Sequence, residues 1–143
     1  MSAYYSNAYL ETQVGTSDPI ALVISLYESA IAKVSRAMQA IEDGDYVKRG
    51  EMTSETAEIL LTLSNSLDFS QSNNLAGRLF ALYNFMMRQL LEANRNNDVE
   101  VLQEVKSTLN ILLSGWTTIE DKSEDDSDGK KEEASRISFQ MMA

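Results

Sequence analysis

The sequence predicts an all-α protein that folds as an antiparallel up-down-up-down four-helix bundle. Only one proline and six glycines occur in 143 residues, so few residues interrupt a helix. Apolar residues recur every three or four positions in four segments of about 20 to 24 residues, the spacing of one helical face. The loops between these segments are short, and short loops force neighbouring helices to run antiparallel.

The first 16 residues show no sustained helical period, and we interpret residues 1–16 as a mobile arm. Tyr9 and Leu10 mark a candidate docking turn in this arm. Tyrosines on such an arm are either incidental or amphipathic anchors that lie on the bundle.

The bundle is expected over residues 17–119, with its first helix over about 18–42. Asp18 is suited to cap the free N–H groups of this helix, and Pro19 suits its first position because no N–H is needed there. Gly44 follows the last turn and favours the left-handed conformation found beyond helix ends.

The second helix is expected over about 47–68, where Gly50 leaves the exact start open. Leu60 and Leu61 lie beside its core row. That row consists of Met52, Thr56, Ile59, Leu63 and Leu67.

The third helix, expected over about 74–95, carries two apolar rows, although a helix packed on one side needs only one. The second row therefore indicates either a central position in the bundle or a face that a partner covers. Considered without the rest of the chain, this helix favours the central position. The first row is Leu75, Leu79, Leu82, Met86, Leu90 and Ala93. The second row is Ala76, Phe80, Tyr83, Met87 and Leu91.

The fourth helix is expected over about 98–119, with Asp98 as its cap. Its core stripe is Leu102, Val105, Leu109, Leu112, Trp116 and Ile119. Val101, Ile111 and Leu113 fall outside that stripe, so they are apolar residues that a four-helix core need not use.

Residues 120–143 form an acidic tail that we expect to be disordered or loosely attached, because residues 120–136 are charged and lack an apolar period. Residues 137–142, Ile-Ser-Phe-Gln-Met-Met, are apolar again. They represent either a frayed end or a short segment that folds back onto an apolar groove.

Part of the tail resembles an EF-hand loop. Glu124, Asp126, Asp128 and Gly129 occupy its positions one, three, five and six, but Ser135 stands where a bidentate glutamate is required. A solvated acidic tail explains these residues better, and we expect no bound metal.

Composition excludes several classes of function. The chain has no histidine and no cysteine, which removes catalytic triads, zinc sites, haem ligation and histidine phosphotransfer. The net charge of −10 argues against nucleic-acid binding and against anionic membranes. Neither a secretory signal nor a run of about 18 apolar residues is present. We therefore expect a cytoplasmic protein that is not an enzyme and needs no cofactor.

Several short motifs, in this order, resemble the flagellar secretion chaperone family (FliS). The third helix carries the most specific of them, and Glu104-Val105 and Trp116 fall where the family has an EV pair and a late tryptophan. The matching segments are Ala8-Tyr9, Val14-Gly15-Thr16-Ser17-Asp18-Pro19, Leu26-Tyr27-Glu28-Ser29-Ala30-Ile31, Leu82-Tyr83-Asn84-Phe85-Met86 and Leu90 to Asp98. Asn84, Ser29, Asp18 and Gly115 depart from the family pattern, and the acidic tail is not part of it.

The resemblance implies a bundle that binds the disordered C-terminal segment of flagellin along apolar grooves. Such a chaperone holds flagellin monomeric and competent for flagellar type III secretion, and export-apparatus components are further candidate partners. It also implies that the arm, through Tyr9, covers part of the groove and yields to the client.

The candidate partner-binding residues come from the arm and from the last three helices. For each helical residue, an ordinary core position is the competing interpretation. The candidates are Tyr9, Leu10, Ile59, Leu63, Leu67, Phe80, Tyr83, Met87, Val101, Ile111 and Leu113. The alternative function is a structural or regulatory adaptor whose spare face binds a folded helical partner or a second copy.

Overall fold

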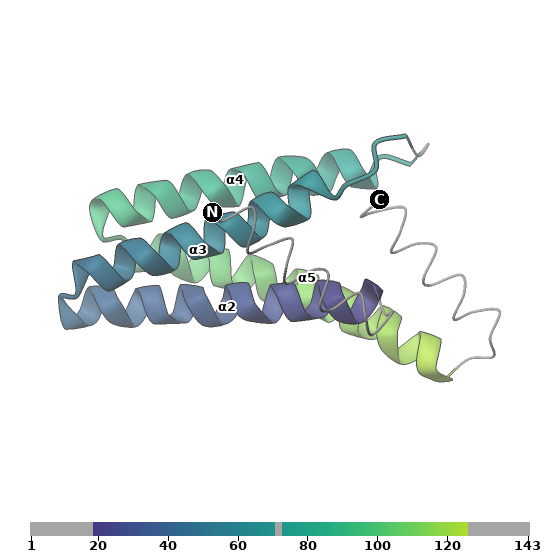
Figure 1. Cartoon of the computed structure of the whole chain (residues 1–143), viewed down its shortest axis with the longest axis horizontal. Coiled ribbons are helices and arrows are strands. Elements are labelled where there is room, and N and C mark those ends of the chain that lie inside the picture. Colours follow the sequence, from purple (N-terminus) through teal and green to yellow (C-terminus); the bar gives the residue numbers. More distant parts are fainter. Residues whose placement is uncertain (1–18, 71–72, 126–143) are drawn as a thin grey trace.

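The computed structural model describes residues 19–70 and 73–125 (Figure 1). The expected arm with Tyr9 and Leu10, the helix cap Asp18 and most of the EF-hand-like loop lie outside these residues. Within them the chain is helical and has no strand, so the predicted all-α four-helix bundle is confirmed. The helices are α2 (Pro19–Asp43), α3 (Tyr46–Asn65), α4 (Leu75–Asn96) and α5 (Val99–Asp125).

Consecutive helices run antiparallel and form a ring in which each helix packs against two neighbours (Figure 1). α2 lies between α3 and α5, and α4 also contacts α3 and α5. The packing between α4 and α5 is the least extensive of the four neighbouring pairs. α4 is therefore not a central helix, and a central position does not account for its second apolar row.

The last helix continues beyond the expected end at residue 119 and stops at Asp125. Glu120, Lys122 and Glu124 have good helix propensity, and the next glycine is Gly129, so no residue breaks the helix there. Apolar periodicity ends earlier because this part of α5 projects beyond the other helices and has no core to face (Figure 1).

Polar residues close the turns at one end of the bundle. The carboxylates of Asp45 and Asp98 accept hydrogen bonds from the backbone N–H groups of Lys48, at 3.1 Å, and Val101, at 3.2 Å. These bonds satisfy N–H groups that have no partner in the first helical turn. Asn97 adopts the left-handed conformation, with φ 54°, at the end of α4.

Two glycines offer a matched test of helix termination. Gly44 has φ 71°, so Gly44→Ala should cost about 1–2 kcal/mol of stability, since a Cβ disfavours that conformation. Gly115 is helical, and a Cβ added there meets nothing within 4 Å, so Gly115→Ala should gain about 0.5–1 kcal/mol. Urea unfolding measures the free energy of unfolding of both variants. Effects of the same sign would contradict the conclusion that Gly44 needs the left-handed conformation and Gly115 does not.

A polar contact crosses the apolar core. The hydroxyls of Tyr27 and Tyr83 are 2.6 Å apart. Both tyrosines are fully buried, and burial raises the pKa of each phenol above 10.0. The contact joins α2 and α4, two helices that are not neighbours in the ring.

Candidate functional site

The surface of α4 is unusually apolar. Leu91 is 68% exposed, and Leu75, Phe80 and Phe85 are also exposed to solvent. In α2, by contrast, none of the large apolar side chains of the described residues is exposed. Exposed apolar area is costly in water, so this surface is a candidate for covering by a partner.

The two apolar rows of α4 do not separate as the sequence suggested. The buried stripe combines members of both rows: Ala76, Leu79, Tyr83, Met86, Leu90 and Ala93. Leu75, a first-row residue, is 38% exposed, and Leu82 is half-buried. The second-row residues left over are Phe80, Met87 and Leu91, which follow one flank of the helix at intervals of seven and four residues.

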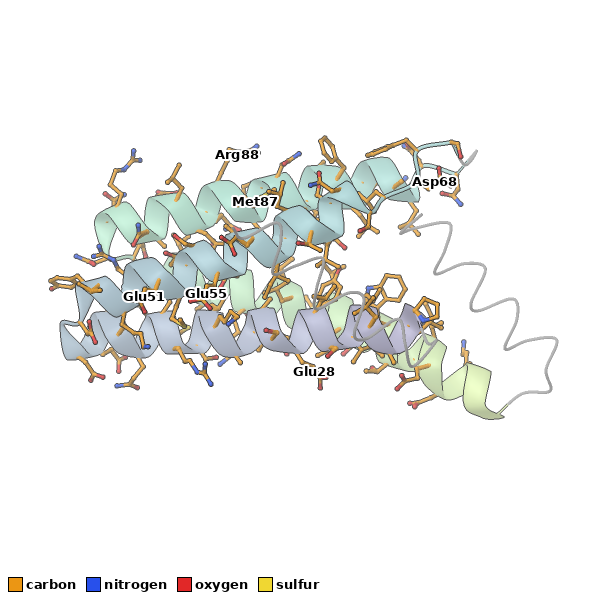
Figure 2. The ribbon with its side chains drawn as sticks, viewed as in Figure 1. Glu28, Glu51, Glu55, Asp68, Met87 and Arg88 are labelled. Carbon is orange, nitrogen blue, oxygen red and sulfur yellow. The ribbon has the colours of Figure 1, made fainter. Side chains whose placement is uncertain are left out.

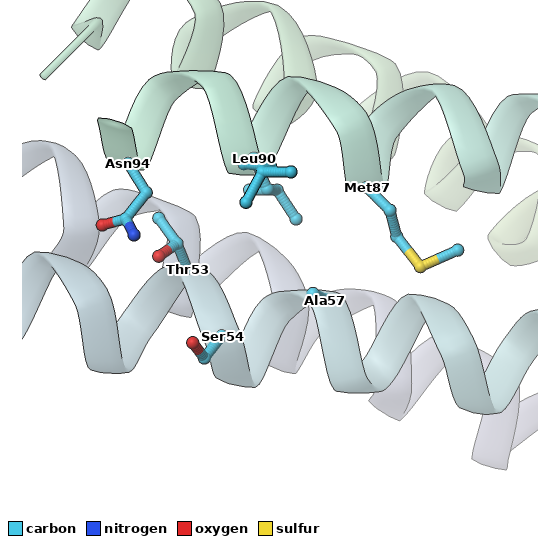
Figure 3. A pocket seen from close by; sticks show the side chains of 7 residues that line it. Thr53, Ser54, Ala57, Met87, Leu90 and Asn94 are labelled. Carbon is cyan, nitrogen blue, oxygen red and sulfur yellow. The ribbon is translucent and has the colours of Figure 1, made fainter. Parts of the chain in front are cut away.

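That flank faces α3. A hollow of about 200 Å³, open to solvent, lies between the two helices (Figure 3). Met87 projects from α4 toward α3 at the level of Ala57, with Ser54 and Asn94 near the other end of the hollow (Figure 3). The lining residues are Thr53, Ser54, Ala57, Met87, Leu90, Leu91 and Asn94.

Exposed apolar residues continue from this hollow toward the α3–α4 turn. Leu61 lies one helical turn beyond Ala57 and is 50% exposed. At the turn, Phe69 and Phe80 stack edge to face, with ring centroids 5.5 Å apart. Such a pair contributes about 0.5–1.5 kcal/mol beyond its buried area, so it stabilises this end of the surface.

We call the hollow, together with the exposed apolar residues beyond it, the α3–α4 groove. It is formed by Ala57, Leu61, Phe69, Phe80, Met87 and Leu91. From Phe80 to Leu91 it follows about 16 Å of α4, three helical turns. A groove of this kind suits an amphipathic helix with anchors at i, i+3, i+4 and i+7, and a methionine adapts its shape to an irregular partner.

The groove has a polar border. Arg49 donates from Nε to the Oδ1 atom of Asn94, at 2.8 Å, and thereby holds the Asn94 side chain at one end of the hollow. Arg88 lies next to Met87 in the sequence and projects away from the bundle, with its guanidinium 5.9 Å from the Phe85 ring centroid (Figure 2). Apolar anchors with polar groups around them are the usual composition of a protein-binding surface.

The opposite flank of α4 faces α5 and combines polar and apolar groups. Gln89 donates from Nε2 to Glu104 of α5, at 3.0 Å. The Oε1 atom of Gln89 is buried and has no hydrogen-bond partner among the described residues. Phe85, one turn before Gln89, is 49% exposed, Val101 is half-buried, and Ile111 is 73% exposed. We call this second surface the α4–α5 seam.

The remaining predicted residues do not reach either surface. Leu63, Leu67 and Tyr83 are buried in the core. Ile59 is half-buried and lies one turn after Glu55, whose carboxylate pairs with Lys33 of α2 at 2.9 Å. Ile59 therefore faces α2 rather than α4. Leu113 is half-buried and packs against the core.

The structure brings together Phe80 and Met87 from the predicted set and adds residues that the prediction omitted. Leu91 belonged to the second row, and Leu61 was an apolar residue beside the core row, so spacing contained a signal for both. Phe69 lies in the turn, where helical spacing carries no information. Its edge-to-face contact with Phe80 of α4 identified it.

No helix in residues 19–70 and 73–125 is both long and apolar enough to cross a membrane.

Comparison with known proteins gives a consistent result. A family model described as flagellar protein FliS matches residues 1–123. The flagellar secretion chaperone FliS of Salmonella typhimurium is 32% identical over 119 residues, which cover 82% of this chain and 88% of the relative. The chaperone FliSB of Pseudomonas aeruginosa is 31% identical over 115 residues, with coverages of 80% and 91%. The FliS chaperone of Bacillus subtilis is 29% identical over 109 residues, with coverages of 76% and 80%.

Proposed function

This chain belongs to the flagellar protein FliS family of flagellar secretion chaperones, and we propose that it binds the disordered C-terminal segment of flagellin in the α3–α4 groove. In the bacterial cytosol it would keep flagellin from polymerising prematurely and competent for type III secretion. The role is one of binding, without catalysis or a cofactor. Export-apparatus components are further candidate partners.

The exposure of Leu91, Leu61 and Phe80 on the side of the bundle that holds the hollow supports this proposal most strongly. A disordered client that becomes helical loses conformational entropy, so the apolar area it buries must be large. Three helical turns of exposed apolar side chains, with the open hollow at Met87, offer such an area. A groove with its own charged residues would instead favour a polar client.

The proposal keeps the α4–α5 seam as a secondary surface. Ile111 and Val101 stay candidate contacts, because a long client can extend across α4. The roles of Tyr9 and Leu10 stay predictions from the resemblance. Leu63, Leu67 and Tyr83 are left out of the proposed surface, since a client could reach them only if the core opened.

Calorimetric titration with the C-terminal segment of the cognate flagellin tests the proposal. We expect saturable one-to-one binding, a gain in helix by circular dichroism and a negative heat-capacity change, because apolar surface is buried as the client folds. No binding at micromolar concentration would contradict it. Binding of a folded helical protein instead would favour the adaptor function.

A further inference from the structure

The chain carries an apolar segment that neither the bundle nor the proposed client site uses. Residues 137–142 contain Ile137, Phe139, Met141 and Met142, after a charged stretch without apolar periodicity. The family match ends at residue 123, so this segment lies outside the part shared with the family. Four large apolar side chains after a charged linker would be costly to leave in water, so we expect a surface to cover them.

We propose that residues 137–142 dock in the α3–α4 groove of the same molecule and compete there with the client. The competition rests on the proposed function, whereas the docking does not. The segment supplies side chains of the same chemistry as the groove, including two methionines that adapt to irregular surfaces.

The topology places the start of the tail at the appropriate end of the bundle. α5 ends at Asp125 at the same end where α4 begins with Leu75 (Figure 1). The Phe69–Phe80 pair, which forms one end of the groove, also lies there. The tail therefore begins at the end of the bundle where the groove begins and need not run the length of the bundle to reach it.

The linker is long enough to span the distance. Eleven residues, 126–136, separate Asp125 from Ile137. Fully extended they reach about 36–40 Å, and as a flexible chain about 17–20 Å on average. α4 is one of the two neighbours of α5, and packed helices lie about 8–10 Å apart, but the last turns of α5 project beyond this packing, so the linker also covers that added separation. The groove lies on the far flank of α4, one helix diameter further.

Charge contributes little to this route. The linker, residues 126–136, contains four acidic and three basic residues, which gives a net charge of −1. Linker length and apolar chemistry therefore support the docking, and charge does not.

The α3–α4 groove is the better docking surface of the two that flank α4. The α4–α5 seam contains the carboxylate of Glu104 and the amide of Gln89, which apolar side chains cannot hydrogen-bond. The hollow beside Met87 is lined mainly by apolar atoms and is open to solvent. An apolar segment gains most by entering this hollow.

Paramagnetic relaxation in the full-length chain tests the docking. The sequence has no cysteine, so a nitroxide attached through Ser138→Cys is the only label. We expect methyl signals of Leu61, Met87 and Leu91 to lose more intensity than those of Ile111 and of Val47, which lies at the other end of the bundle. Adding Phe139→Asp and Met141→Asp to the labelled chain should restore the groove signals.

Three results would overturn the docking. Groove signals could be no weaker than those of Val47, or the aspartate substitutions could leave the broadening unchanged. Broadening of the same size could also appear when a spin-labelled chain without isotopes is mixed with an isotope-labelled chain without nitroxide. That third result would identify a second copy as the occupant.

The competition has a separate measurement. Phe139→Asp and Met141→Asp together should tighten the apparent flagellin affinity about 3- to 10-fold, because a tethered competitor acts at an effective concentration in the millimolar range. Unchanged affinity would refute the competition. If no variant binds flagellin but the relaxation result holds, the proposed function fails and the docking stands.

Discussion

Replacing Met87 and Leu91 together by glutamate is expected to weaken flagellin binding by at least about 30-fold. Each side chain lines the hollow of the α3–α4 groove, and burying a carboxylate against an apolar client leaves it without a partner. Loss of one apolar hot spot costs about 2 kcal/mol, which corresponds to about 30-fold in affinity. Calorimetric titration of the variant with the flagellin segment measures the change.

The fold should tolerate this double substitution, since Leu91 is 68% exposed and Met87 half-buried. A matched control carries Ala32→Glu and Val47→Glu, which bring the net charge to the same −12 from exposed side chains of α2 and α3 that lie outside the proposed surfaces. We expect this control to bind within about threefold of the parent. Equal losses in both variants would show that charge, and not the groove, determines binding.

Ile111→Glu alone then distinguishes the two flanks of α4. If the client lies only in the α3–α4 groove, Ile111→Glu has no effect. A loss confined to this variant would instead place the client on the α4–α5 seam. The proposed site would then be wrong, although the chaperone function could still hold.

Alkaline conditions are expected to unfold this protein through its buried tyrosine pair. Burial raises the pKa of both Tyr27 and Tyr83 in the folded chain, so above pH 10 the unfolded chain releases protons that the folded chain keeps. Stability is therefore complete below pH 10 and falls as the pH rises beyond it. Each tyrosine contributes a slope of about −1.4 kcal/mol per pH unit.

The double variant Tyr27→Phe, Tyr83→Phe should lose this steep dependence, while the single variant Tyr83→Phe should cost about 1–3 kcal/mol at pH 8. The single change leaves one buried hydroxyl with fewer hydrogen bonds, whereas the double change removes both. Urea unfolding between pH 8 and pH 11.5 follows both effects. Parallel curves for the parent and the double variant would show that the pair does not govern alkaline stability.

Local sequence signals predicted the fold. Few helix breakers and four segments with helical spacing led to four antiparallel helices, because that periodicity is local and needs no knowledge of neighbours. The predicted end of the last helix lies six residues before the observed end, because apolar spacing carries no information where a charged helix extends beyond the core. The candidate site was less predictable. Two of its members, Phe80 and Met87, were expected, and the rest of the groove was not.

Spacing by itself showed that α4 has more apolar surface than one side of a bundle needs, and the excess is real. Which residues form that excess depended on the rotation of α4 against α3 and α5. Tyr83 belongs to the second row, but it is buried and its hydroxyl meets Tyr27 across the core, whereas Leu75 of the first row is exposed. Periodicity determines the angle between two rows on a helix, and only packing determines which direction is inward.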